Sequence, residues 1–215
     1  MHLSQEFGLT FKEIKKDGNS IDKKLDMLVS SDTAQAIIKS MGLGMIGFSD
    51  AYEYLEPDLI LILGDRFEIY SAASAAMISR IPIAHLHGGE STEGLIDEPI
   101  RHCITKMSQI HFVAAEEYRK RVIQLGEIPE NVFNVGGMGV DALNKIKLLS
   151  RKELEKALNL KFWKRNLLIT YHPVTIEGSD NSIEQMTELL SALEYFHDVN
   201  LIFTMPNADT GGLEL

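Results

Sequence analysis

Acidic, histidine and arginine side chains occur just after several aliphatic segments of this 215-residue chain. Asp65 and Arg66 follow the first such segment, and His87 and Glu90 follow the second, separated by a Gly-Gly pair. Carboxylates and histidines can exchange protons with a substrate, whereas a guanidinium can hold a diphosphate through two parallel hydrogen bonds. The sequence therefore favours proton-transfer chemistry on an anionic ligand.

Further candidates stand near the start of a predicted helix and after two later strands: Asp97, Arg101, His172 and Asn207. Several candidates also have structural interpretations. Asp65 and Asp97 can serve as helix caps, and Arg66 can be a surface ion-pair partner. The Gly-Gly turn, flanked by two histidines and an acid, is unusual for a simple connection, so we favour a functional interpretation there.

Strand-like and helix-like segments alternate between residues 57 and 149. Residues 57–64 form an aliphatic run bounded by Pro57 and Gly64, which is typical of a strand buried in a parallel sheet. The alternation predicts a doubly wound α/β sheet, whose ligands bind beyond the carboxyl ends of the strands. We predict strands at 57–64, 81–87, 109–115 and 131–136, and helices at 67–80, at 98–108 with Asp97 as N-cap, at 116–126 ending at Gly126, and at 140–149.

Two domains are expected from the order of these segments. Residues 1–150 form a Rossmann-like domain, 151–165 a helix and linker, and 166–215 the start of a second Rossmann-like domain. The second domain has predicted strands at 166–171 and 200–204 and a helix at 182–196.

The segments at the two ends of the chain indicate that it is a piece of a longer protein. Residues 1–56 contain a predicted helix at 23–41 and no convincing aliphatic strand, whereas a β-α-β unit usually opens a doubly wound domain. The second domain is too short to close its own sheet. We expect this chain to be the middle of an enzyme.

Composition excludes several classes of protein. The net charge of −10 argues against a nucleic-acid surface, which needs a basic footprint. No apolar run approaches the roughly 20 residues of a membrane helix. The single cysteine, Cys103, lies in a predicted helix, where we interpret it as a packing residue, and its solitary occurrence favours a reducing, cytoplasmic setting.

Metal and cofactor sites are not expected. His85 and His87 alternate along a predicted strand, so they would point to opposite faces of the sheet and could not share one ion. Cysteine pairs, an HExxH spacing and a phosphate-binding Walker loop are also missing from the sequence. We predict an enzyme that needs no metal and no nicotinamide.

The chain contains a linked set of motifs in a fixed order. They are Gly64-Asp65-Arg66-Phe67, His85-Leu86-His87-Gly88-Gly89-Glu90, Thr92-Glu93-Gly94, Ile96-Asp97-Glu98, Ile100-Arg101-His102, Ile104-Thr105-Lys106, Tyr171-His172-Pro173-Val174-Thr175 and Pro206-Asn207-Ala208-Asp209. This set resembles the hydrolysing UDP-N-acetylglucosamine 2-epimerase family. Some members carry Glu at the position of His87, and the His pattern is more similar to bacterial enzymes of the sialic-acid or legionaminic-acid routes.

The resemblance implies a GT-B arrangement, in which two Rossmann-like domains bind a nucleotide-sugar between them. It implies that UDP leaves the sugar to give a glycal, and that hydration of the glycal gives a free N-acetylmannosamine-type sugar. The implied acid–base residues are Asp65, Glu90, Asp97 and His87, and the implied substrate and nucleotide contacts are Arg66, His172, Asn207 and Arg101.

Other functions stay open. A non-hydrolysing epimerase or a GT-B glycosyltransferase would differ in its products, because only the hydrolysing enzyme releases UDP and a free sugar without an acceptor. A non-catalytic fragment is a further alternative, and we expect the 215-residue chain alone to show no epimerase activity and little affinity for UDP. The complete enzyme is expected to be a homo-oligomer.

Overall fold

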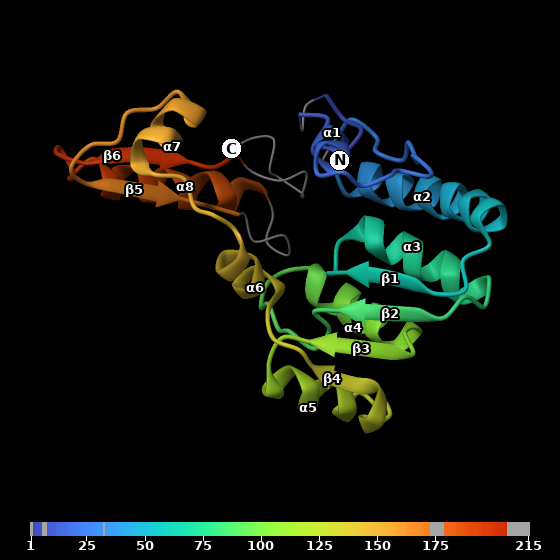
Figure 1. Cartoon of the computed structure of the whole chain (residues 1–215). Helices are drawn as coiled ribbons and strands as arrows, with labels where there is room; N and C mark the ends of the chain where they lie inside the picture. Colours follow the sequence, from blue (N-terminus) through green and yellow to red (C-terminus); the bar gives the residue numbers. More distant parts are fainter. Residues whose placement is uncertain (1, 6–7, 32, 173–178, 206–215) are drawn as a thin grey trace. The chain divides into compact units, whose positions relative to one another are not determined.

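The computed structural model describes residues 2–5, 8–31, 33–172 and 179–205. The chain divides into two compact units, residues 1–138 and 139–215 (Figure 1). This division falls in α6 (Met138–Lys145), ahead of the domain limit at residue 150, which stays a prediction. Within the described residues, no helix combines the length and apolar character needed to cross a membrane.

The first unit is built on a four-stranded parallel sheet whose strands lie side by side in chain order (Figure 1). The parallel α/β architecture predicted from the alternating segments is confirmed. The strands are β1 (Ile60–Leu63), β2 (Ile83–Leu86), β3 (Ile110–Val113) and β4 (Val132–Asn134), and the connections contain α3 (Phe67–Ile78), α4 (Asp97–Met107), α5 (Glu116–Gln124) and the 3-10 helix η1 (Pro129–Asn131).

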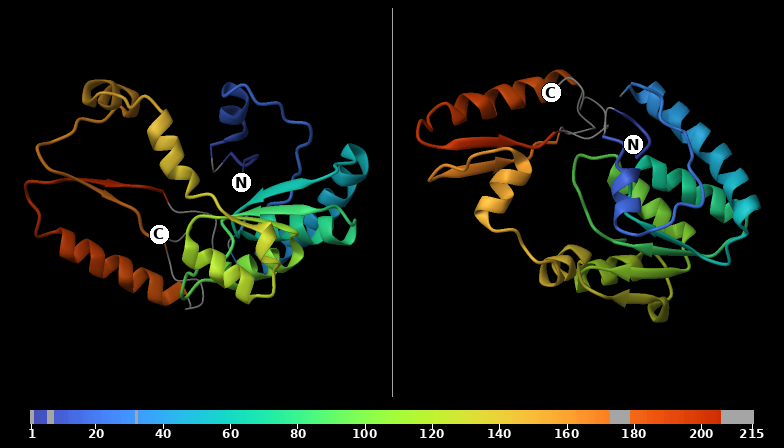
Figure 2. Two further views of the ribbon diagram at one scale, coloured as in Figure 1. Left: turned by 60° about the horizontal axis from the view of Figure 1, so that its bottom comes forward. Right: turned by 45° about the horizontal axis from the view of Figure 1, so that its top comes forward.

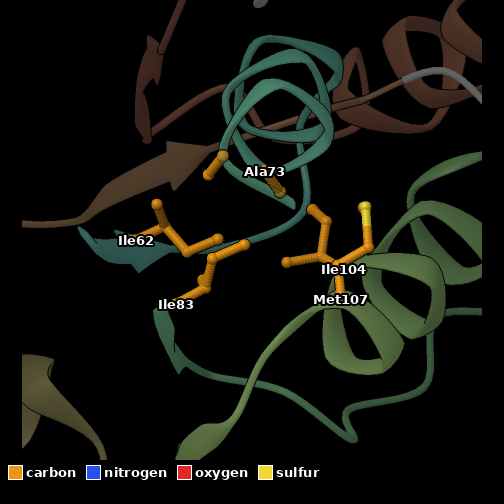
Figure 3. Packing of buried hydrophobic residues seen from close by; sticks show 6 residues of the cluster. Ile62, Ala73, Ile83, Ile104 and Met107 are labelled. Carbon is orange, nitrogen blue, oxygen red and sulfur yellow. The ribbon is translucent and has the colours of Figure 1, made fainter. Parts of the chain in front are cut away.

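One face of this sheet carries the core. Parallel strands in chain order with right-handed crossovers bring their connecting helices to the same face. Ile62 and Ile83 pack there against Ala73 of α3 and against Ile104 and Met107 of α4 (Figure 3). Each fully buried aliphatic side chain contributes about 2 kcal/mol to the stability of the folded chain, relative to an exposed one. The core therefore fixes α3 and α4 against β1 and β2, the strands whose following loops carry Asp65, His87 and Glu90.

The other face of the sheet is apolar but open to solvent. Leu61 and Leu63 alternate with the core residue Ile62 and are 63% and 51% exposed, and Phe133 on β4 is 46% exposed. The three clusters of buried apolar residues in the described part of the first unit contain no side chain from this face. A contiguous apolar surface of this kind promotes association.

The predicted helix at 23–41 is wrong in its bounds. Residues 21–30 are irregular, and α2 (Ala34–Leu55) begins only after Thr33, whose hydroxyl accepts a hydrogen bond from the amide of Ala36. Met27 packs against Gly44, where a Cβ atom would lie 2.6 Å from the methionine methyl group. Gly44 thus admits this segment beside α2, which itself packs along α3 (Figure 2). A short helix, α1 (Phe11–Lys16), precedes this region.

Two smaller sequence interpretations also change. Ile96, not Asp97, occupies the N-cap position of α4 and makes no side-chain cap bond, so Asp97 is the first helical residue. An acid there still favours the positive end of the helix dipole. Cys103 lies in α4 but is exposed, so it is not a packing residue. Gly126 does follow the end of α5, with φ +98°.

The second unit contains a parallel pair of strands with a helix between them in the chain, as predicted (Figure 2). Ser150 and Glu153 form a reciprocal capping box that starts its first complete helix, which explains the helix before the predicted linker. The elements are α7 (Arg151–Leu158), β5 (Asn166–Ile169), α8 (Ser179–Leu193) and β6 (Asn200–Phe203).

The open sheet face predicts self-association of the 215-residue chain. Replacing Leu61 and Leu63 together by Lys should shift the chain towards monomer in sedimentation velocity, because both positions are exposed and charge opposes apolar contact. Leu148 and Leu149, also exposed, provide a control pair outside this sheet. If the sheet variant does not dissociate, or if the Leu148→Lys/Leu149→Lys variant dissociates equally, the sheet face is not responsible.

Candidate functional site

The loops after β1 and β2 carry most of the predicted site residues. Gly64, with φ +86°, turns the chain out of β1, and Asp65 and Arg66 complete the turn into α3. His87 and Glu90 lie in the connection from β2 to α4. Because β1 and β2 are parallel neighbours, both loops leave the same edge of the sheet.

Arg101 joins these two loops from α4. Its guanidinium Nη2 pairs with Asp65 Oδ2 and lies 3.3 Å from Thr92 Oγ1, while Nη1 donates to the Glu90 carbonyl oxygen at 2.9 Å. The Arg101 side chain is 6% exposed, and that of Asp65 is 23% exposed. A largely buried charge is tolerated where a counter-charge and hydrogen bonds replace its hydration. The structure therefore brings together Asp65, Arg101 and the loop of Glu90.

His87 and Glu90 form a direct pair. His87 Nδ1 lies 2.7 Å from Glu90 Oε1, and both side chains are partly exposed. His87 lies beyond the end of β2 with φ +63°, so the interpretation that it alternates with His85 along a strand is wrong. A histidine bonded to a carboxylate can pass a proton to or from a ligand at this edge.

The Gly-Gly pair is explained by close packing within the protein. A Cβ atom at Gly88 would lie 3.1 Å from His85 Nδ1, and one at Gly89 would lie 2.5 Å from the carbonyl oxygen of Tyr118 in α5. Gly89 also has φ +79°, and its carbonyl accepts a hydrogen bond from Arg121. These glycines hold the loop against α5 and so determine where His87 and Glu90 lie.

His85 lies fully buried beneath the site. Its Nε2 lies 2.9 Å from the carbonyl oxygen of Gly64, which requires the proton on Nε2, and Thr105 Oγ1 lies 3.4 Å from Nδ1. The pKa of His85 is lowered from 6.5 to about 4, mainly by burial. The Gly64 bond and Asp65 act to raise this pKa, whereas His111 and Arg101 act to lower it. His85 is therefore neutral at pH 7.

The start of α4 is held by a second carboxylate. Glu98 accepts hydrogen bonds from the Ser91 hydroxyl and, at 2.6 Å, from the Thr92 amide, and the Ser91 bond is the main cause of a lowered pKa of Glu98. Asp97 lies four residues before Arg101, on the same face of α4. Both acids thus lie close to the loop that carries Glu90.

Of the three predicted nucleotide contacts Arg66, His172 and Asn207, the structure describes the first two. Arg66 is partly buried, with Nε 3.2 Å from Glu68 Oε2. His172 is exposed after β5, in the second unit. Asn207 lies outside the described residues. Among the described residues, no group of three or more His, Cys, Asp or Glu side chains converges on a possible metal position.

The sequence analysis did not identify the buried residues that support the site loops. His85 and Thr105 were quoted within motifs and His85 was weighed as a metal ligand, but neither was given a role in the site, and the buried position of Arg101 was not foreseen. One signal was available: His85 lies inside an otherwise aliphatic strand, and a buried polar side chain requires hydrogen-bond partners.

The parallel sheets and their crossover helices make this an α/β protein, and its fold is that of solved structures of the GT-B type. The sequence pattern that defines the UDP-N-acetylglucosamine 2-epimerase family matches residues 1–215, and the chain belongs to that family.

Two relatives extend this assignment. The chain is 47% identical over 212 residues to the GDP/UDP-N,N'-diacetylbacillosamine 2-epimerase (hydrolyzing) of Campylobacter jejuni, covering 99% of this chain and 55% of the relative. It is 37% identical over 212 residues to the UDP-N,N'-diacetylbacillosamine 2-epimerase (hydrolyzing) of Legionella pneumophila, covering 99% and 55%. The chain therefore spans about half the length of these relatives.

A solved structure supports the fold. The UDP-GlcNAc 2-epimerase of Methanocaldococcus jannaschii, in complex with UDP-GlcNAc and UDP, matches with a TM-score of 0.74 at 17% identity. The match covers 94% of this chain and 55% of that structure.

The buried His85 predicts a pH-dependent stability. The unfolded chain binds a proton at this histidine near pH 6.5, but the folded chain does so only near pH 4, so stability falls as the pH drops between these values. The loss at pH 4 should be about 3 kcal/mol. Urea titrations at pH 7 and pH 4 should show a loss of stability that is larger by this amount in wild type than in His85→Gln, because His102 and His111, whose pKa values burial also lowers, are common to both proteins. Parallel pH dependence in the two proteins would contradict the assignment.

Proposed function

We propose that a protein containing this chain catalyses the hydrolysing 2-epimerisation of UDP-N-acetylglucosamine or a related UDP-acetamido sugar. The products are UDP and the free 2-epimer, an N-acetylmannosamine-type sugar that serves nonulosonic acid synthesis in the cytoplasm. UDP-N,N'-diacetylbacillosamine is a candidate substrate because the Campylobacter and Legionella relatives bear its name.

One observation carries this proposal. Asp65 and the His87–Glu90 pair stand at the carboxyl edge of neighbouring strands and are tied together by the buried Arg101. A reaction that removes a proton from one face of a sugar carbon and returns one to the other face needs two proton-transfer groups held in fixed positions. The arrangement supplies such groups on two loops with a common anchor.

The proposed chemistry begins with cleavage of the anomeric C–O bond. Positive charge builds at C1 as UDP departs with the bonding electrons, and this charge acidifies the C2 proton. A carboxylate takes that proton, and C1=C2 forms to give a glycal. Water then adds to C1 while a proton enters C2 from the opposite face, which yields the inverted free sugar. The overall reaction consumes one water and needs no metal or nicotinamide.

We assign the acid–base roles to Asp65, Glu90 and Asp97, with His87 as the partner of Glu90. Arg66 is assigned to the leaving diphosphate because it stands at the same edge as Asp65 and a guanidinium binds phosphate oxygens in pairs. We assign nucleotide-sugar contacts in the second unit to His172 and Asn207. The buried geometry of Arg101 favours positioning of Asp65 over the nucleotide contact predicted for it.

Asp65→Asn in the full-length protein should lower turnover by at least about 10²-fold, the usual scale for losing a general acid–base group. The amide keeps the size of the side chain but removes the counter-charge of the buried Arg101, so turnover is measured at a temperature where circular dichroism shows the variant folded. Asp58→Asn, at the exposed opposite end of β1, is the matched control and should leave turnover unchanged. A coupled assay for released UDP measures both. Near-normal turnover of Asp65→Asn would remove Asp65 from the mechanism.

Arg66→Ala should weaken UDP binding at least about tenfold, since a charge-assisted bidentate contact would be lost. Isothermal titration of UDP into the full-length protein measures the effect. Arg80→Ala, at the exposed far end of α3, should bind UDP normally. Unchanged affinity in Arg66→Ala would make this arginine a structural partner of Glu68.

A further inference from the structure

The Gly64–Asp65 turn is held from below by a residue that cannot reach solvent. His85 is 0% exposed, and its Nε2–H donates to the Gly64 carbonyl at 2.9 Å. The amide of Gly64 in turn donates to the carbonyl of Leu86 at 3.3 Å. Both polar groups of the Gly64 backbone are thus fixed by β2, and Asp65 is the next residue.

The same histidine is closely packed on its other side. Thr105 Oγ1 donates to the Arg101 carbonyl at 3.0 Å and lies in packing contact 3.4 Å from His85 Nδ1, and a Cβ atom at Gly88 would lie only 3.1 Å from either atom. The imidazole therefore packs between the turn that carries Asp65 and the helical turn that carries Arg101. Its fixed neutral state keeps the donor on Nε2 at neutral pH.

We propose that His85 is a positioning residue of the reaction: its hydrogen bond to the Gly64 carbonyl fixes the turn that presents Asp65 to the sugar. This inference rests on the proposed function. His85 does not itself reach the ligand edge, because its side chain points into the core beneath the turn. A displacement of about 1 Å in a reacting group can cost 10²-fold in rate, so loss of this bond should be visible in kcat.

The chain provides a matched control in the neighbouring strand. His111 lies directly opposite His85 in the β2–β3 register and is also 0% exposed, but its Nε2 lies 3.2 Å from Glu127, away from the site loops. Replacing either histidine removes one fully buried imidazole. Only the His85 substitution removes a bond to the turn of Asp65.

The experiment compares His85→Leu, His85→Gln and His111→Leu in the full-length protein, at a temperature where circular dichroism shows each folded. The Gln amide can still donate at the Nε2 position, whereas Leu cannot. His85→Leu should lower kcat at least about tenfold, while His85→Gln and His111→Leu stay within about threefold of wild type. Should His85→Leu fail to fold, His85→Asn replaces it, because its shorter amide cannot reach the Gly64 carbonyl.

Hydrogen exchange of a peptide spanning residues 63–67 gives a readout independent of turnover. The Gly64 amide should exchange at least about threefold faster in His85→Leu, and at the wild-type rate in His85→Gln and His111→Leu. Only the first variant loses the bond that holds the Gly64 carbonyl, so the turn opens more often and the bond from the Gly64 amide to Leu86 opens with it.

Three results would overturn the proposal: wild-type kcat in His85→Leu, an equal loss of kcat in His85→Gln, or an equal loss in His111→Leu. If wild type releases no UDP from either candidate sugar nucleotide, the proposed function fails, and the exchange comparison alone decides whether His85 holds the turn.

Discussion

The guanidinium of Arg101 is the interaction on which the arrangement of the site depends. Its side chain is nearly closed off from water, so its charge has lost most of its hydration. Burying a cation costs several kcal/mol unless a counter-charge and hydrogen bonds take the place of water. The Asp65 carboxylate, the Glu90 carbonyl and the Thr92 hydroxyl do so. The two loops are therefore held in place by the same electrostatic requirement.

The hydrophobic core determines where this cation lies. Ile104, three residues after Arg101, is fully buried against the sheet, and so is Thr105, whose hydroxyl bonds back to the Arg101 carbonyl. The packing of α4 on β1 and β2 thus fixes the position of the guanidinium relative to the carboxyl ends of these strands. His85 adds a second link from the same core to the turn of Asp65. The apolar core thus positions His85 and Arg101, and these two buried polar residues position Asp65.

The fold was predictable where the sequence carries a local signal. The aliphatic run at 57–64 has a length and composition that favour a buried strand, and β1 lies within it. The helix expected from residue 23 was misplaced because the cap at Thr33 decides where α2 begins. The candidate site residues come from motifs and stay predictions, whereas the pairing of Asp65 with Arg101 had no local signal, since 36 residues separate them. The left-handed backbone of His87 likewise depends on the packing of the following glycines.

Proton exchange at C2 of the sugar is the central chemical claim, and it can be measured directly. The full-length protein would be incubated with UDP-N-acetylglucosamine and, separately, with UDP-N,N'-diacetylbacillosamine in deuterium oxide, and the products followed by proton NMR. The account predicts that at least one substrate gives UDP and an equal amount of free 2-epimer carrying deuterium at C2. A product that keeps its C2 proton, or a 2-epimer still attached to UDP, would contradict it.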